Sequence, residues 1–194
     1  MGRFSQAISE GDGISVVPLL EGDVAGLAAL AESAGAEAIA VWTADEVERA
    51  RGQTGLPVLV RRPTAGADAC LFSFRELVDS EEIERLYVSL AGEGVDCVVE
   101  VRDEEELEAA LERVDPEIIL ISERHPDEGE EDLERTLDLL PDVPAGKLVI
   151  SESRVNVREQ VIALERAGVD AVLVGADMLR SADFSAALAE LTGR

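Results

Sequence analysis

The sequence predicts an α/β protein with the (β/α)8 fold of a TIM barrel, in a shortened form. Residues 147–178 read as a buried strand, a helix and a second buried strand, which is one unit of a parallel sheet covered on both faces. One short pattern also recurs four times: a glycine, an apolar residue, an acidic residue and then an apolar run. It begins at Gly35, Gly66, Gly94 and Gly168. Their spacing is close to the roughly 30 residues of one βα unit, or to about twice that length. Glycine is the usual left-handed cap where a helix ends.

Eight apolar runs, too short and too apolar for surface helices, are predicted strands. They span residues 14–20, 36–42, 57–61, 68–74, 95–101, 118–123, 147–152 and 171–175. Amphipathic stretches predict helices at residues 23–34, 44–51, 79–92, 103–113, 130–140, 155–167 and 182–192. Eight strands alternating with helices favour a closed barrel over the alternative, an open sheet of six strands.

One connection is too short to hold a helix. Residues 63–67 alone separate Arg62 from Asp68, whereas a parallel neighbour needs a crossover of about a dozen residues or more. We therefore expect that the helix between strands three and four is missing, or that one of these strands lies outside the barrel. The chain is expected to be a single domain, residues 1–194, just under the roughly 200 residues at which such barrels begin.

The composition excludes several classes of function. Forty-two acidic residues against 17 lysines and arginines give a formal charge of −25, while 46% of the residues are hydrophobic, so the chain can bury a core. Such a charge repels nucleic acid and anionic membranes, and neither is an expected partner. The acidic residues are spread over helix faces, as in a protein of a salt-rich cytoplasm, where ions screen the repulsion. An ordinary acidic enzyme is the alternative.

The sequence predicts a soluble, cytoplasmic protein without a metal or a cofactor. Residues 1–13 contain no apolar signal region, and no run of about 18 apolar residues occurs. Cys70 and Cys97 lie in apolar strands, where each is expected to act as a small hydrophobic residue. Their spacing fits no metal-binding motif.

Several runs resemble the indole-3-glycerol phosphate synthase family. The resemblance is strong over residues 95–192, in VVEVRDEEELEAAL (98–111), ILISERH (119–125) and LVISESRVNVREQVIALERAGVDAVLVGADML (148–179), and faint over residues 4–74. It implies a TIM barrel of tryptophan biosynthesis, a lyase that closes an indole ring on a phosphorylated anthranilate derivative by condensation, decarboxylation and dehydration. A small phosphorylated metabolite is then the expected partner. A partner enzyme or a second copy of the chain is the alternative.

The resemblance also implies roles for individual residues. The family's glutamates after strands five and seven match Glu100 and Glu152, which become catalytic candidates. Substrate or phosphate binding falls on Ser153, Gly175 and Arg124, and also on Ser122 and Arg154, where the family has other residues.

Other family positions carry different residues here. The lysine at the end of strand three is Arg61, the asparagine after strand six is Ser122, and the second phosphate glycine is Arg154. The glutamate-x-lysine of strand one is replaced by residues 19–21, Leu-Leu-Glu, and the Ser-Pro-Ser loop after it is missing. The scaffold therefore resembles the family more closely than the catalytic groups do.

These replacements bear directly on the chemistry. The one lysine of the chain, Lys147, starts a strand, on the rim that serves stability and not catalysis. Arg61 can hold an anion but gives up no proton, because an arginine guanidinium is not deprotonated in proteins. The family reaction calls for a proton donor with a pKa near neutrality. Glu100, Glu152 and Arg61 are the candidate catalytic residues. We expect ring closure by these residues to be slow or to proceed by a different route.

Two alternatives stay open at the carboxyl ends of the strands. Glu100 and Glu152 either form an acid and base pair or are held by arginines in a structural ion-pair cluster. Arg154 either binds phosphate with its fork of N–H groups or pairs with Glu152 or Asp177 and fills the site itself.

Further side chains are expected at the same mouth. Trp42 and Phe74 end strands two and four and either stack on a ligand or plug the mouth. His125, the one histidine, follows strand six as a base or as a solvated loop residue. Positive charge converges there, which favours an anionic ligand. The arginines concerned are Arg61, Arg62, Arg102, Arg124 and Arg154.

Two functions fit these observations. The first is a family enzyme with an altered proton donor. The second is a paralogue without lyase activity that binds an anionic metabolite or a partner enzyme through the same mouth.

Overall fold

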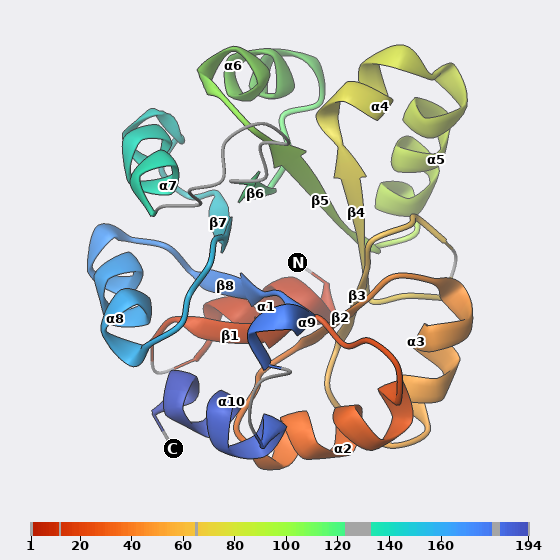
Figure 1. Ribbon diagram of the computed structural model, residues 1–194. Helices are drawn as coiled ribbons and strands as arrows, with labels where there is room; N and C mark the ends of the chain where they lie inside the picture. Colours follow the sequence, from red (N-terminus) through yellow and green to blue (C-terminus); the bar gives the residue numbers. More distant parts are fainter. Residues whose placement is uncertain (1, 12, 65, 123–132, 180–182, 194) are drawn as a thin grey trace.

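In the computed structural model, eight parallel strands form a nearly closed barrel with helices around it (Figure 1). The structure describes residues 2–11, 13–64, 66–122, 133–179 and 183–193. The strands are β1 (Ser15–Pro18), β2 (Ile39–Val41), β3 (Val58–Val60), β4 (Ala69–Ser73), β5 (Asp96–Val101), β6 (Ile118–Ser122), β7 (Leu148–Glu152) and β8 (Ala171–Val174). They pair in the order β1-β8-β7-β6-β5-β4-β3-β2. A bridge between Leu19 and Ala40 joins β1 to β2, which confirms the predicted barrel.

Alternate residues of each strand face the inside of the barrel, as the period of two in a strand requires. Val98 of β5 packs in an inner cluster with Leu120 of β6 and Ile150 of β7. Val99 and Val101 pack in an outer cluster between the strands and the helices. Both faces are therefore buried, which is why the strands read as continuous apolar runs.

The helices cover the outer face of the barrel. They are α2 (Val24–Ser33), α3 (Ala44–Arg51), α4 (Phe74–Asp79), α5 (Glu81–Gly92), α6 (Glu104–Arg113), α7 (Glu134–Leu139), α8 (Arg158–Ala167), α9 (Ala176–Leu179) and α10 (Phe184–Thr192), with a 3-10 turn η1 (Leu140–Asp142) after α7. Among the described residues 61–64 and 66–68 no helix separates β3 from β4, as predicted. Residues 130–132 of the helix predicted at residues 130–140 lie outside the described part.

Side-chain caps set the ends of several helices. Asp103 accepts the backbone N–H of Glu106 at 2.8 Å and so begins α6. Gln160 accepts the N–H groups of Asn156 and Val157 at 2.7 and 3.3 Å, so α8 begins three residues later than the predicted residue 155. Gly168 ends α8 with a φ of 104°, the predicted left-handed cap.

A short helix, α1 (Arg3–Ser9), fills the barrel at the amino ends of the strands, and the sequence did not predict it. Phe4 and Ile8 are buried in the inner cluster. Asp96, at the start of β5, accepts hydrogen bonds from Gly2 N at 2.9 Å, Ser5 N at 2.8 Å and Ser5 Oγ at 2.9 Å. This rim is therefore occupied by apolar side chains and by a satisfied carboxylate.

Both cysteines are buried on neighbouring strands, where Cys70 of β4 lies opposite Cys97 of β5, and neither forms a disulfide. Burial raises the pKa of the Cys97 thiol to about 12 and also raises that of Cys70. Because the thiolate is the reactive form, both thiols are inert near neutral pH, in agreement with a packing role.

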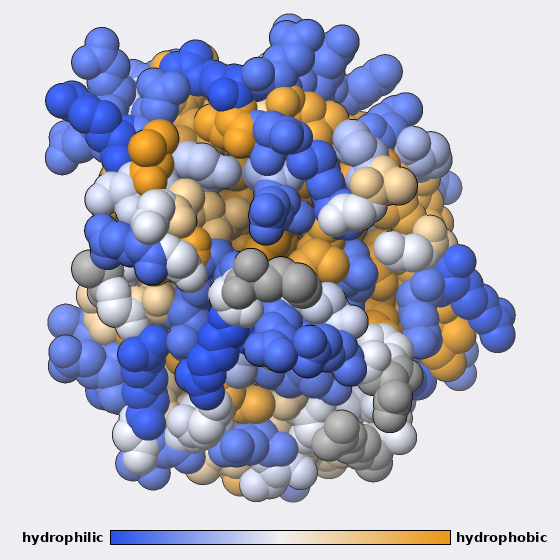
Figure 2. Space-filling view, turned by 180° about the vertical axis from the view of Figure 1, so that it is seen from behind, coloured by the Kyte–Doolittle hydropathy of each residue, from blue (hydrophilic) through white to orange (hydrophobic). Residues whose placement is uncertain are grey.

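Hydrophilic side chains make up most of the outline of the molecule on the face shown in Figure 2, with apolar side chains between them. No helix in the described ranges is long and apolar enough to cross a membrane.

Candidate ligand site at the barrel mouth

The inward residues that follow the inner apolar layer form a polar layer at the carboxyl ends of the strands. Glu100 stands two residues after Val98, and Glu152 stands two residues after Ile150, so both point inward. By the same alternation the layer consists of Glu21, Trp42, Arg61, Ser73, Glu100, Ser122, Glu152 and Gly175. This is the rim at which barrels of this kind place their ligand and catalytic groups.

A bidentate ion pair crosses the mouth. Arg61 Nη1 lies 2.6 Å from Glu152 Oε1, and Nη2 lies 3.4 Å from Oε2. Both side chains are only 7% exposed. Because β3 and β7 are four places apart in a ring of eight strands, the pair spans the barrel. Ser122 Oγ donates a further hydrogen bond to Glu152 Oε2 at 3.3 Å.

Trp42 packs against this ion pair. Its ring centroid lies 4.9 Å from the Arg61 guanidinium carbon, a cation–π distance. Its indole Nε1 donates to Glu21 Oε1 at 2.9 Å. Trp42 is thus held in the wall of the mouth by Arg61 and Glu21.

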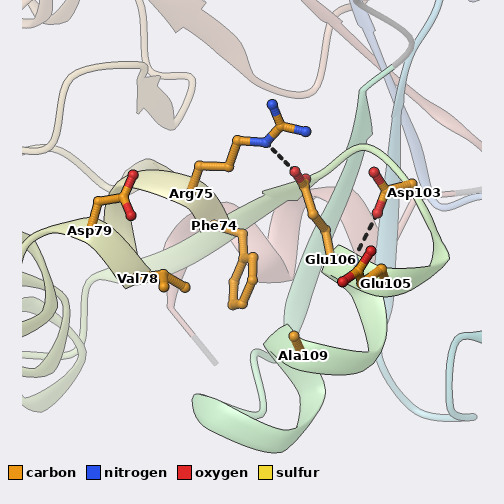
Figure 3. A pocket seen from close by; sticks show the side chains of 8 residues that line it. All are labelled: Phe74, Arg75, Val78, Asp79, Asp103, Glu105, Glu106 and Ala109. Atoms are coloured by element: carbon orange, nitrogen blue, oxygen red, sulfur yellow. Dashed lines mark hydrogen bonds and ion pairs between the residues drawn. The ribbon is translucent and has the colours of Figure 1, made fainter.

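Phe74 lies elsewhere, and its expected place at the mouth was wrong. It is the first residue of α4 and packs in the outer cluster. It lines a groove between α4 and α6, together with Val78 and Ala109 (Figure 3). The strand ends at Ser73, so the helix turns the next side chain away from the mouth.

Glu100 and Arg102 lie side by side on the β5 side of the mouth. Glu100 is buried, and its Oε1 is 3.6 Å from Arg102 Nη2, an ion-pair distance beyond that of a hydrogen bond. Since Glu152 faces Arg61 in turn, each glutamate has an arginine beside it. This geometry favours the ion-pair cluster over a pair of carboxylates that share a proton.

The residues after β7 and β8 form the opposite side of the mouth. Ser153 was expected there, but its buried hydroxyl contacts that of Ser151, which lies 2.8 Å from Thr136 Oγ1 of α7, so the hydroxyl points toward the helix layer and not into the mouth. Arg154 is exposed, and Gly175 is partly buried at the end of β8. Arg124 and His125 lie outside the described residues, and so does the side chain of Asp177.

Lys147 lies at the other end of the barrel, directly before β7. Its Nζ donates to Asp115 Oδ1 at 2.6 Å and to the Pro116 carbonyl at 2.9 Å. The lysine therefore serves the rim opposite the candidate site. In the described ranges no group of three or more histidine, cysteine or acidic residues is placed to hold a metal ion.

One residue of the mouth was missed in the sequence. Arg75 lines a cavity there with Arg61, Arg62 and Arg102, but the predicted fourth strand ran through residue 74 and left Arg75 in a loop. Residues 72–76, FSFRE, contain two aromatic residues and then two charged residues. Nothing in this run marks where the strand ends and the helix begins.

The fold and this rim define a (β/α)8-barrel protein whose charged residues gather at the carboxyl ends of its strands. The family model of indole-3-glycerol phosphate synthase matches residues 58–191. The chain belongs to this family.

Curated relatives agree. The chain is 30% identical to the indole-3-glycerol phosphate synthase of Geobacillus thermodenitrificans over 88% of this chain and 73% of that one. It is 36% identical to the synthase of Bordetella pertussis, over 76% of this chain and 60% of that one. It is also 36% identical to that of Geobacillus sp. (strain WCH70), over 65% and 48%. The chain thus spans about half to three fifths of the length of the last two relatives.

Solved structures share the barrel at low sequence identity. Thiamine phosphate pyrophosphorylase from Pyrococcus furiosus superposes with a TM-score of 0.72 over 93% of this chain and 94% of that one, at 17% identity. N-acetylmannosamine-6-phosphate 2-epimerase from Clostridium perfringens gives the same TM-score and identity over 89% of each chain. This likeness establishes the fold alone.

Proposed function

We propose that the protein binds a small phosphorylated metabolite at the barrel mouth and closes an indole ring slowly or not at all. The observation that carries this proposal is the buried pair of Arg61 and Glu152. Arg61 stands where the resemblance to the family places a lysine, and Glu152 stands at a family glutamate. Two residues with proposed chemical roles are therefore occupied with each other.

The pair is poorly suited to proton transfer. Arg61 is a poor proton donor because a guanidinium is not deprotonated in proteins, and Glu152 accepts hydrogen bonds from two of its N–H groups. A general acid or base works best with a pKa near the working pH. Lys147, the one lysine of the chain, is bound to Asp115 at the other rim.

Binding of a phosphate group is supported by the opposite side of the mouth. Arg154 follows β7 and Gly175 follows β8, and these strands are hydrogen-bonded neighbours. Barrels of this type frequently hold phosphate in the loops after strands seven and eight. An arginine fork adds two charge-assisted hydrogen bonds to phosphate oxygens.

Arg154→Ala tests this proposal. If Arg154 holds the phosphate, calorimetric titration with a sugar phosphate at constant high chloride should show binding weakened by about 1.5–3 kcal/mol, the value of a hydrogen bond to a charged group. Arg85→Ala is the matched control, because Arg85 is 78% exposed on α5 and its loss removes the same charge. Unchanged or tighter binding by Arg154→Ala means that Arg154 fills the site. If neither the wild-type protein nor Arg154→Ala binds the sugar phosphate, a role in binding a partner protein is favoured.

We also propose that the protein is adapted to high salt, on the evidence of its formal charge of −25. The melting temperature should fall as sodium chloride is reduced, because the Debye length grows from about 3 Å at 1 M to about 30 Å at 0.01 M and like charges then repel. Thermal melts followed by circular dichroism measure this. Sucrose at equal osmolarity is the control, since it strengthens burial without screening charge. A melting temperature independent of salt contradicts the adaptation.

A further inference from the structure

We infer that a second anion site lies on the β3, β4 and β5 side of the mouth, and that it takes a compact anion of several charges, with phosphate or polycarboxylate oxygens. A cavity of about 420 Å³ opens there. Arg61, Arg62, Arg75 and Arg102 line it, with Leu71 and Ser73 among the residues beside them. Four of the 17 basic residues of a chain with a charge of −25 meet at one cavity.

Carboxylates behind the cavity hold two of these arginines in place. Glu152 binds Arg61 from β7. Glu106 of α6 binds Nε of Arg75, which extends from α4 toward it (Figure 3). Glu106 also accepts the backbone N–H of Arg102 at 2.9 Å. A guanidinium carries five N–H groups, so these contacts fix its direction and leave further donors for a ligand.

Two arginines have hydrogen-bonding groups to spare. The Nε atom of Arg102 is buried and has no hydrogen-bond partner in the described structure. A buried donor without a partner costs free energy, and Arg102, whose side chain as a whole is 28% exposed, lines the cavity. Arg62 is exposed at the cavity wall and forms no ion pair with another described residue. Both groups suit an anion with several oxygens.

The acidic residues of the cavity limit which ligand it accepts. Glu76 and Glu100 also line it. Together with Glu106 and Glu152, which pair with Arg75 and Arg61, they equal the four arginines in formal charge. Long-range attraction is therefore small, and binding depends on hydrogen bonds from fixed guanidinium groups. A compact ligand that reaches Arg62 and Arg102 while avoiding the two glutamates fits this arrangement.

This site is separate from the phosphate site proposed above. Only Arg61 among its arginines stands at a position to which the family resemblance gives a role. Arg154 does not line the cavity. The two sites can therefore be tested with different variants.

The chain's one tryptophan provides a reporter for this site, because Trp42 lines the cavity. Titration with citrate, and separately with inorganic phosphate, at constant sodium chloride should give a saturable change in Trp42 fluorescence. Arg102→Gln should shift the midpoint at least about tenfold to weaker binding, as expected for a lost charge-assisted contact. Arg62→Gln provides a second variant at an exposed position, should Arg102→Gln fail to fold. The ligand with the lower midpoint identifies the class, polycarboxylate or phosphate.

Two further variants decide the outcome. Arg85→Gln, which removes one positive charge from α5, should leave the midpoint unchanged, and Arg154→Ala should do the same. The inference is overturned if neither ligand gives a saturable signal, or if Arg85→Gln weakens binding as much as Arg102→Gln. The phosphate proposal rests on Arg154, so its failure would leave the Trp42 fluorescence signal of this second site intact.

Discussion

Glu152→Gln is expected to lower the free energy of unfolding by about 3–5 kcal/mol, the usual cost of removing one partner from a buried ion pair. The substitution keeps the shape of the side chain but leaves the Arg61 guanidinium buried without a counter-charge. Arg61 is 7% exposed, so water cannot readily replace the lost carboxylate. Urea denaturation in molar salt, followed by circular dichroism, measures the change.

An exposed ion pair supplies the matched control. Glu81 and Arg85 of α5 are 92% and 78% exposed and lie 3.9 Å apart, so Glu81→Gln should cost less than about 1 kcal/mol. The double variant Arg61→Met/Glu152→Leu should recover much of the loss, because apolar residues avoid the desolvation of two charges. If Glu152→Gln costs no more than Glu81→Gln, water reaches the pair and the mouth is open.

The barrel could be predicted because its information is local. Each strand contains an apolar run, and several of the helices begin with a polar cap or end at a glycine. The helix α1 lacks such signals: seven residues are too few for a stable isolated helix, and Phe4 and Ile8 are held by the barrel interior. Helix α4 was missed because the apolar residues of β4 continue into it at Phe74.

The sequence could predict which of these side chains stand at the carboxyl ends of the strands, but not which of them pair. The strand ends placed Arg61, Glu100 and Glu152 on one rim. The partner of Glu152, however, is separated from it by 91 positions and comes from the opposite side of the barrel. Such a contact depends on barrel closure and side-chain length, which no local pattern encodes. The same reason hid Arg75, whose position depends on the start of α4.

Indole ring closure is expected to be at least about 10²-fold slower in kcat than in a family member with both lysines, the usual scale for loss of a positioned acid or base. The family substrate is incubated with the protein in molar salt while indole fluorescence is followed. Arg61→Lys restores one titratable donor beside Glu152, but residues 19–21 still lack the lysine of strand one. This variant alone should therefore recover only part of the deficit.

The control for this rescue is Arg85→Lys, which makes the same exchange on the exposed face of α5 and should leave turnover unchanged. A kcat within tenfold of an ordinary synthase would mean that another group at the mouth donates the proton. Glu100 is then the first residue to substitute, because it is buried, points inward and has only a long contact of 3.6 Å to Arg102. Loss of that activity in Glu100→Gln, with the fold intact, would reassign the reaction to a carboxyl group in place of a lysine.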